Sequence, residues 1–128
     1  MTPEWVNETV RAFGRQLQFE NLELNERGAA GIRFENGLSF YLEYADGAMQ
    51  MSAGFAADET AATLKNLLAG VHPSARTGGV RLRAVRFERT GEARFVARLT
   101  DRELTPTAME AAFHALWEAA DYQRRARS

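Results

Sequence analysis

Residues 32–55 read IRFENGLSFYLEYADGAMQMSAGF, and this stretch decides the fold. Apolar and polar residues alternate along three short runs, which is the period of a β-strand with one buried face. Asn36-Gly37 and Asp46-Gly47 separate the runs, and both pairs favour tight hairpins because their residues tolerate a positive φ; the first predicts a type I′ turn. The stretch therefore predicts a three-stranded antiparallel meander with one apolar face.

A helix is expected before the meander, beginning at Pro3 with Thr2 as its candidate cap. It ends near Leu17, and Gly14 lies inside it. A glycine there weakens a helix by about 1 kcal/mol relative to alanine, so it indicates close packing against another backbone. The apolar residues at helical spacing are Val6, Val10, Phe13 and Leu17, with Trp5 beside them.

The segment between this helix and the meander carries a weaker signal. Leu22 and Leu24 alternate with Glu23, which predicts a short first strand or a lead-in to one. Residues 25–31 read as a loop.

A second helix is expected after the meander, with Asp58 as its N-cap and Glu59 near the positive end of its dipole. Gly70 and Pro73 mark its end, and residues 72–79 read as a loop. Its apolar stripe consists of Ala61, Leu64, Leu67, Leu68 and Val71.

Residues 80–88 predict a strand whose apolar phase switches between Ala84 and Val85. A β-bulge would absorb the switch; alternatively, the strand begins in one packing environment and ends in another. Thr90-Gly91 then turns the chain into a last strand. The two apolar sets on this first strand are Val80, Leu82 and Ala84, then Val85 and Phe87.

The final helix starts at Thr105-Pro106, and Thr107 with Glu110 offers an alternative capping box. A wide apolar stripe that includes Trp117 follows. The complete order is α-β-β-β-α-β-β-α, which predicts an α+β fold with an antiparallel sheet packed against helices, in one domain of residues 1–128.

Composition places the chain among ordinary globular proteins. It has 128 residues, of which 45% are hydrophobic and 26% charged, and it has no cysteine, so neither a disulfide framework nor a thiolate metal site is available. No apolar run approaches the roughly 18 residues of a membrane span, and no signal peptide is visible at the N-terminus. We expect a cytoplasmic protein.

Charge is uneven along the chain. Residues 1–60 carry ten acids against four arginines, a balance of −6, whereas residues 61–128 carry twelve bases against seven acids, a balance of +5. Such asymmetry indicates either an electrostatic partner or solvated faces of opposite sign. The arginines of the last predicted hairpin, which would form a basic patch for nucleic acid or pair with nearby acids, are Arg81, Arg83, Arg86, Arg89, Arg94 and Arg98.

Catalytic and metal-binding patterns are missing from the sequence. Neither His72 nor His114 has a carboxylate or a second histidine at ligand spacing, and no nucleotide-binding or nucleophile-elbow motif occurs. The first five predicted elements match the order of a double-stranded RNA-binding domain. That domain needs basic side chains at the start of its second helix to bind phosphates, and Asp58-Glu59 at that position would repel them. We expect a non-enzymatic binding scaffold without a metal or cofactor.

The whole chain resembles a class I type III secretion chaperone of the Tir chaperone family. The resemblance rests on the element order, on Phe13-Gly14-Arg15-Gln16-Leu17, on the meander, on Leu67-Leu68-Ala69-Gly70 and on the amphipathic last helix. It implies a homodimer in the bacterial cytosol that takes part in virulence. Such a dimer binds the unfolded N-terminal segment of a secreted effector by strand addition and by apolar side chains in grooves. A further candidate partner is the export ATPase of the secretion apparatus.

The resemblance also suggests which residues make these contacts. The candidate dimer interface is Leu64, Leu67, Leu68, Val80, Leu82 and Ala84, of which the last three would face the partner subunit while Val85 and Phe87 face the protomer core. The candidate effector contacts are Trp5, Phe19, Leu22, Leu24, Tyr41, Trp117 and Tyr122. Two alternatives stay open: an adaptor of the same fold that binds another protein or peptide outside secretion, and a nucleic-acid binder that uses the arginine-rich hairpin.

Overall fold

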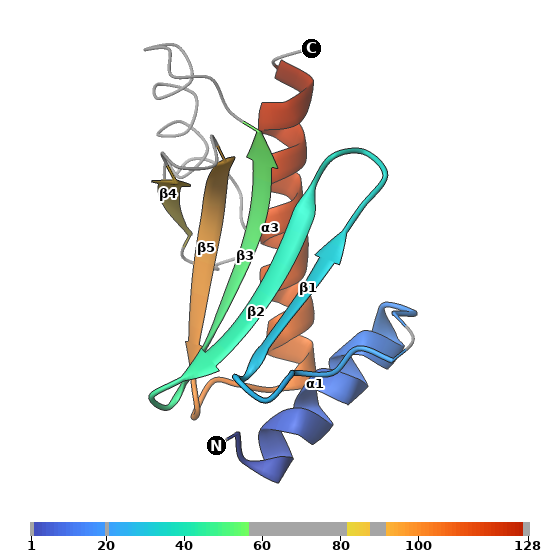
Figure 1. Cartoon of the computed structure of the whole chain (residues 1–128), viewed down its shortest axis with the longest axis vertical. Helices are drawn as coiled ribbons and strands as arrows, with labels where there is room; N and C mark the ends of the chain where they lie inside the picture. Colours follow the sequence, from blue (N-terminus) through green and yellow to red (C-terminus); the bar gives the residue numbers. More distant parts are fainter. Residues whose placement is uncertain (1, 20, 57–81, 88–91, 127–128) are drawn as a thin grey trace.

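The computed structural model describes residues 2–19, 21–56, 82–87 and 92–126. In this part of the chain, antiparallel strands form a five-stranded sheet in the order β1-β2-β3-β5-β4, and helices lie on one face of it (Figure 1). The elements are α1 (Glu4–Gln16), β1 (Ala29–Arg33), β2 (Ser39–Ala45), β3 (Ala48–Ala56), β4 (Arg83–Phe87), β5 (Glu92–Thr100) and α3 (Pro106–Ala126). The α+β class and the meander are confirmed, whereas the predicted second helix and the turn at Thr90-Gly91 lie outside the described residues.

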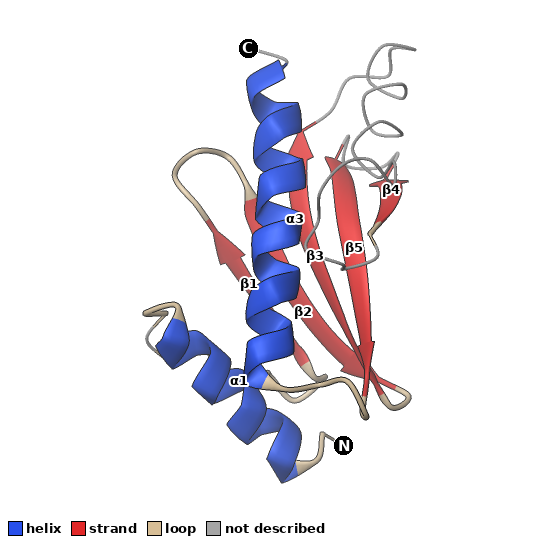
Figure 2. Cartoon of the chain, turned by 180° about the vertical axis from the view of Figure 1, so that it is seen from behind, coloured by secondary structure: helices blue, strands red, loops and turns tan. Residues whose placement is uncertain are grey.

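The register of the meander separates two faces of the sheet. Phe40 of β2 pairs with Ile32 of β1 and with Ala53 of β3, and all three belong to or pack against the hydrophobic core. The next residue, Tyr41, pairs with Gly31 and Ser52 on the opposite face, which we call the outer face. Figure 2 shows α3 running along the core face, with α1 across the lower end of α3.

The two hairpin turns of the meander differ in type. Asp46 and Gly47 both have a positive φ, 52° and 76°, as a two-residue type I′ turn requires. The type I′ prediction for Asn36-Gly37 is wrong, because only Gly37 has a positive φ (91°). Its amide donates to the Phe34 carbonyl at 3.1 Å, while the Asn36 side chain accepts from the Leu38 amide at 3.1 Å, so the loop has three residues.

The two predicted helix caps also differ in outcome: the cap of α1 is wrong and the cap of α3 is confirmed. Thr2 does not cap α1: Pro3 is extended (ψ 148°) and occupies the N-cap position, so the helix begins one residue later than predicted. Thr105 does cap α3, since its hydroxyl oxygen accepts from the Ala108 amide at 3.0 Å. The alternative capping box at Thr107 and Glu110 is therefore wrong, because the helix has already begun at Pro106.

The first strand of the sheet does not lie where the apolar pattern predicted it. Leu22 and Leu24 lie in an irregular segment rather than in a strand, and β1 includes residues 29–31, which we expected to be loop. Ala29, Ala30 and Gly31 are small and carry no alternation for a pattern to detect, yet their backbones pair with β2. Strand pairing therefore extended β1 beyond its hydrophobic signal.

The phase switch in the fourth strand does not come from a bulge within β4. The register with β5 is unbroken from Arg83 to Phe87, so the bulge that the sequence allowed is absent from this strand. Position 84 pairs with Phe95, which is buried in the core, and position 85 pairs with Arg94 of the outer face. Positions 84 and 85 therefore lie on opposite faces of the sheet, as neighbouring residues do in any regular strand.

Gly14 is the point where α1 meets the segment that follows it. A Cβ at this position would lie 3.0 Å from the Cβ of Leu22 and 3.1 Å from the Phe19 carbonyl oxygen. The Phe19 amide also donates to the Gly14 carbonyl at 2.7 Å. The close packing that the glycine indicated is confirmed, and it holds Phe19 and Leu22 against the end of α1.

Candidate functional site

A chain of touching aromatic rings leads from the core to the surface, and we call it the aromatic cluster. Phe113 of α3 is its hub, with ring centroids 4.8 Å from Phe40, 6.1 Å from Phe13 and 5.8 Å from both Phe19 and Trp117. Phe34 completes the cluster, 4.8 Å from Trp117 and 5.9 Å from Phe19. Most of these pairs are tilted or edge-on, the arrangement that aromatic quadrupoles favour.

The aromatic cluster has a buried end and an open end. Phe13, Phe40 and Phe113 are buried in the core, whereas Phe19, Phe34 and Trp117 are only partly buried. Phe19 and Trp117 were predicted as effector contacts, and both lie against Phe34. Phe34 was not predicted, because its alternation with Arg33 and Glu35 is typical of a core residue.

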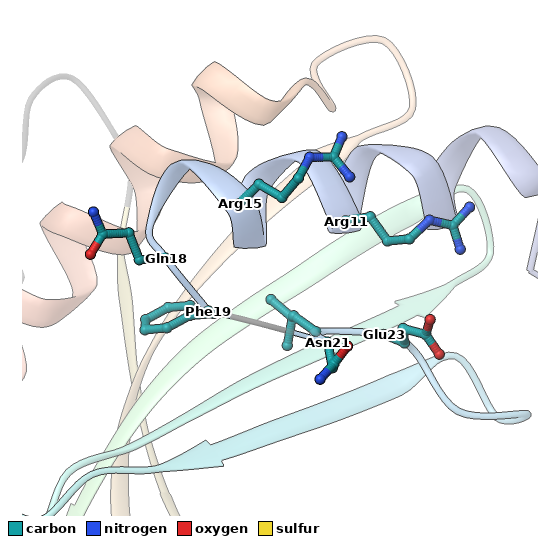
Figure 3. A pocket seen from close by; sticks show the side chains of 7 residues that line it. Arg11, Arg15, Gln18, Phe19, Asn21 and Glu23 are labelled. Atoms are coloured by element: carbon teal, nitrogen blue, oxygen red, sulfur yellow. The ribbon is translucent and has the colours of Figure 1, made fainter.

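Two hollows adjoin the open end, one on each side of the segment that follows α1. The first, about 700 Å³, lies between α1 and this segment and is shown in Figure 3. The second, about 650 Å³, lies between the segment and β1 and reaches Ile32. The two hollows share Gln18, Phe19, Asn21, Leu22 and Glu23. Phe19 thus belongs both to the open end of the aromatic cluster and to both hollows.

The edge of β1 next to the second hollow has backbone groups directed away from the sheet. Just beyond the two ends of β1, Gly28 accepts from the Tyr44 amide of β2 at 2.8 Å, and Phe34 donates to the Leu38 carbonyl, next to the start of β2, at 2.8 Å. In an antiparallel pair the intervening odd-numbered residues then point their N–H and C=O groups outward. Asn25 occupies those of Ala29, donating to its carbonyl at 2.8 Å and accepting from its amide at 3.1 Å. Gly31 and Arg33 are therefore the positions of β1 at which another strand can pair.

The other candidate contacts are spread over the molecule. Leu22 lines both hollows but is only 8% exposed, while Leu24 packs partly buried against the core. Trp5 is 41% exposed in the first turn of α1, and Tyr122 is 61% exposed in the last part of α3. Within the described part of the chain, no ring contact joins Trp5 or Tyr122 to the aromatic cluster.

Tyr41 has neighbours within the protein on the outer face. Its ring lies against Gly31 across the β1–β2 pair, where an added Cβ would be 3.4 Å from the ring, and the Arg94 guanidinium lies 3.9 Å from its centroid. A cross-strand aromatic ring over a glycine restores packing that the glycine lacks. This arrangement gives the Tyr41 ring a packing role on the outer face, and its role as an effector contact stays a prediction.

The predicted dimer interface is described in part only. Leu64, Leu67, Leu68 and Val80 lie outside the described residues. Leu82 packs partly buried against the core, and Ala84 pairs with the core residue Phe95. The division of this strand between the partner subunit and the protomer core stays a prediction.

The described arginines of the β4–β5 hairpin share the outer face of the sheet. Arg94 and Arg98 alternate with core residues of β5, and Arg83 pairs with Val96, which lies between Arg94 and Arg98 on the same face. Arg94 is engaged with Tyr41, and the charge of Arg98 contributes to lowering the pKa of Glu103, after the larger effect of hydrogen bonds from Thr100. Arg81 and Arg89 lie outside the described residues.

The titratable groups suggest structural roles. The Tyr44 hydroxyl donates to Asp101 at 2.7 Å, which joins β2 to the turn before α3 and, with burial and the carboxylate charge, raises the pKa of Tyr44. His114 is exposed, with its Nε2 3.7 Å from Glu110 on the same helix. Among residues 2–19, 21–56, 82–87 and 92–126, no group of three metal-binding side chains forms and no helix could cross a membrane.

Comparison with known families places this architecture. The family model described as the Tir chaperone protein (CesT) family matches residues 8–124, nearly the whole chain. No curated protein sequence matches the chain.

Solved structures share the fold at low sequence identity. A chain of the ExsC–ExsE complex aligns with a TM-score of 0.78 at 20% identity, covering 95% of this chain and 92% of its own. A chain of the HopA1–SchA chaperone–effector complex aligns at 0.71 and 14% identity, covering 98% and 99%. SycH of Yersinia pestis, solved with a fragment of YscM2, gives 0.70 at 14% identity, covering 92% and 98%.

Proposed function

The chain belongs to the Tir chaperone protein family, and on this premise we propose that it is a cytoplasmic type III secretion chaperone. It binds the unfolded N-terminal segment of a secreted effector and keeps that segment soluble and competent for export. In this proposal the protein acts by binding alone.

The observation that carries this proposal is the open end of the aromatic cluster, together with the surface around it. Phe19, Phe34 and Trp117 are partly buried, and Phe19 lines both hollows. Gly31 and Arg33 direct backbone groups out of the neighbouring sheet edge. An unfolded segment needs both features: backbone pairing for any sequence and apolar recesses for particular side chains. One extended segment can use the edge of β1 and place apolar side chains in the adjoining hollows.

Apolar contacts at the open end contribute more to the affinity for a bound segment than backbone pairing at the strand edge does. Ordering a disordered segment costs about 1–2 kcal/mol per residue in backbone entropy, and backbone hydrogen bonds offset little of this because they replace bonds to water. Burying an apolar side chain contributes about 1.5–3 kcal/mol. Aromatic and aliphatic anchors in the hollows must therefore supply most of the net affinity, while the edge of β1 sets the direction and register of the segment.

The proposal includes a homodimer, with Leu64, Leu67, Leu68, Val80, Leu82 and Ala84 as the candidate interface. Sedimentation of the purified protein tests it, and Leu68→Glu and Leu82→Glu should each produce monomers. A wild-type protein that stays monomeric at micromolar concentration would remove the dimer from the proposal. Two variants that remain dimeric would show that the interface lies elsewhere.

Co-purification from the native host tests the function itself. We expect the wild-type protein to retain a secreted effector through the effector's N-terminal segment, and Phe34→Asp to lose it. Ala111→Asp, which adds the same charge at an exposed position of α3, is the matched control and should retain it. Retention of a protein that the secretion system does not export would favour the adaptor alternative. Equal retention by Phe34→Asp and wild type would contradict this site.

A further inference from the structure

The first hollow has an apolar floor and a cationic wall. Phe19 and Leu22 are its apolar lining residues, and Arg11 and Arg15 line it from α1. Figure 3 shows the two arginine side chains running along α1, opposite the segment that carries Phe19 and Glu23. Glu23 lies on the opposite rim. Residues 1–60 contain four arginines against ten acids, so two of the four cations in this acidic half line one hollow.

The two arginines are available for exchange or for new pairing. The Arg11 guanidinium contacts Glu4 at 2.8 Å, but this pair is solvent-exposed, with 39% and 71% of the two side chains accessible. Exposed ion pairs are weak because water screens them, so a carboxylate in a more enclosed position can replace Glu4. Arg15 is exposed, and none of the described residues forms an ion pair with it that the structure records.

The spacing of the two arginines matches an extended chain. Residues four apart on a helix are displaced by about 6 Å along its axis. Side chains two apart on an extended strand are about 6.6 Å apart and point to the same side. A segment lying along the first hollow can therefore place carboxylates at positions i and i+2 opposite Arg11 and Arg15.

We propose that Arg11 and Arg15 make the first hollow selective for an extended effector segment with carboxylates at positions i and i+2 next to an apolar anchor. The inference rests on the proposed function, because it assumes that a polypeptide occupies the hollow. The apolar floor and Glu23 argue against a nucleic-acid phosphate chain, because Glu23 would repel its phosphates and the side chains of Phe19 and Leu22 offer them no hydrogen-bond donor. Glu23 also sets the orientation of the bound segment, because it repels acidic side chains while Arg11 and Arg15 attract them to the α1 side of the hollow.

The selectivity has a consequence for what this chaperone accepts. A charge-assisted contact between guanidinium and carboxylate is stronger than a neutral one, and it becomes more so when water is partly displaced. We expect about a tenfold gain in affinity for each acidic position, a gain that falls as salt rises. Effector segments with the same apolar anchor but lysine in place of the acids should be rejected.

Selection from a displayed library of random linear peptides tests the proposal. The full-length wild-type protein should enrich peptides with an apolar residue next to acidic residues two apart. Arg15→Glu and the double variant Arg11→Glu/Arg15→Glu should lose that bias and enrich lysine or arginine at the same positions. Arg102→Glu lies in the turn before α3, lines neither hollow and carries the same charge change, so it serves as the control and should select like the wild type.

One enriched peptide then provides a quantitative test. Replacing its two acids by lysine should weaken binding to the wild type by about a hundredfold and strengthen binding to the double variant. Circular dichroism of each variant checks that α1 is intact. Apolar peptides enriched without charge bias, identically by wild type and double variant, would overturn the arginine selectivity and leave the chaperone function standing. Failure of the wild type to enrich any peptide would overturn both.

Discussion

The two ends of the aromatic cluster contain the same kinds of residue in different surroundings. Phe13, Phe40 and Phe113 are enclosed by both helices and the sheet, whereas Phe34 and Trp117 form an edge-on pair that is only partly covered. The buried end follows from the apolar pattern of the elements. The open end depends on where α1, β1 and α3 meet.

This comparison separates stability from binding within one continuous cluster. An aromatic ring that is already buried has little surface left to offer a partner, so removing it should mainly affect folding. A partly exposed ring retains surface that a partner can cover, so removing it should affect binding more. Substitutions at the buried end should therefore mainly lower folding stability, and substitutions at the open end should mainly lower effector affinity.

The largest expected effect is that of Phe113→Ala at the hub. Phe113 is 8% exposed and contacts Phe13, Phe19, Phe40 and Trp117. Large-to-small substitutions of this kind cost about 3–5 kcal/mol through lost transfer energy and the cavity left behind. Urea denaturation should show this loss. A cost below about 1 kcal/mol would mean that the hub contributes little and that the division is misplaced.

Trp117→Ala should act mainly on binding. Loss of an aromatic anchor typically costs about 2 kcal/mol or more of affinity, and its partly exposed position predicts a smaller loss of folding stability than at Phe113. Calorimetric titration with the co-purified effector's N-terminal segment measures the first quantity, and urea denaturation the second. Unchanged affinity together with a large loss of stability would place Trp117 with the buried end.

Gly14→Ala links the two sides. Alanine should gain up to about 1 kcal/mol of helix propensity, but its Cβ would press against Leu22 and the Phe19 carbonyl, and such overpacking costs about 1–3 kcal/mol. We expect a net destabilisation of about 1 kcal/mol in urea denaturation, together with weaker effector binding because Phe19, Asn21 and Leu22 line both hollows. A stabilised variant with normal binding would show that the helix end and this segment can separate freely.

The smallest expected effect is that of Tyr44→Phe, at a hydrogen bond that does not involve the aromatic cluster. The bond to Asp101 raises the pKa of Tyr44 above 10.0, so its contribution is fully present below pH 10 and is lost as pH rises through the raised pKa. At neutral pH the variant should lose no more than about 1 kcal/mol, with unchanged effector affinity. Above pH 10 the wild type should lose stability more steeply than the variant in urea denaturation. Parallel curves across that range would contradict this role of the bond.

The sequence predicted the elements better than the surface that they create. Alternation and turn residues located the meander, and Gly14 indicated its close contact, because these signals act over a few neighbouring residues. Phe34 and Arg15 gave no signal, since only the meeting of α1, β1 and α3 leaves one ring partly exposed and one guanidinium over a hollow. The neighbours of Tyr41 gave no signal either: Gly31 and Arg94 lie beside its ring, and the pattern alone cannot place them there.

Residue-resolved amide exchange of the protein, alone and bound to its effector's N-terminal segment, tests the central claim most directly. If the segment pairs with the edge of β1 and covers the open end of the aromatic cluster, the amides of Gly31 and Arg33 should exchange rapidly in the free protein and become protected on binding. The amides of Ala30 and Ile32, which face β2, should be protected in both states. Unchanged exchange at Gly31 and Arg33 in a saturated complex would contradict the account.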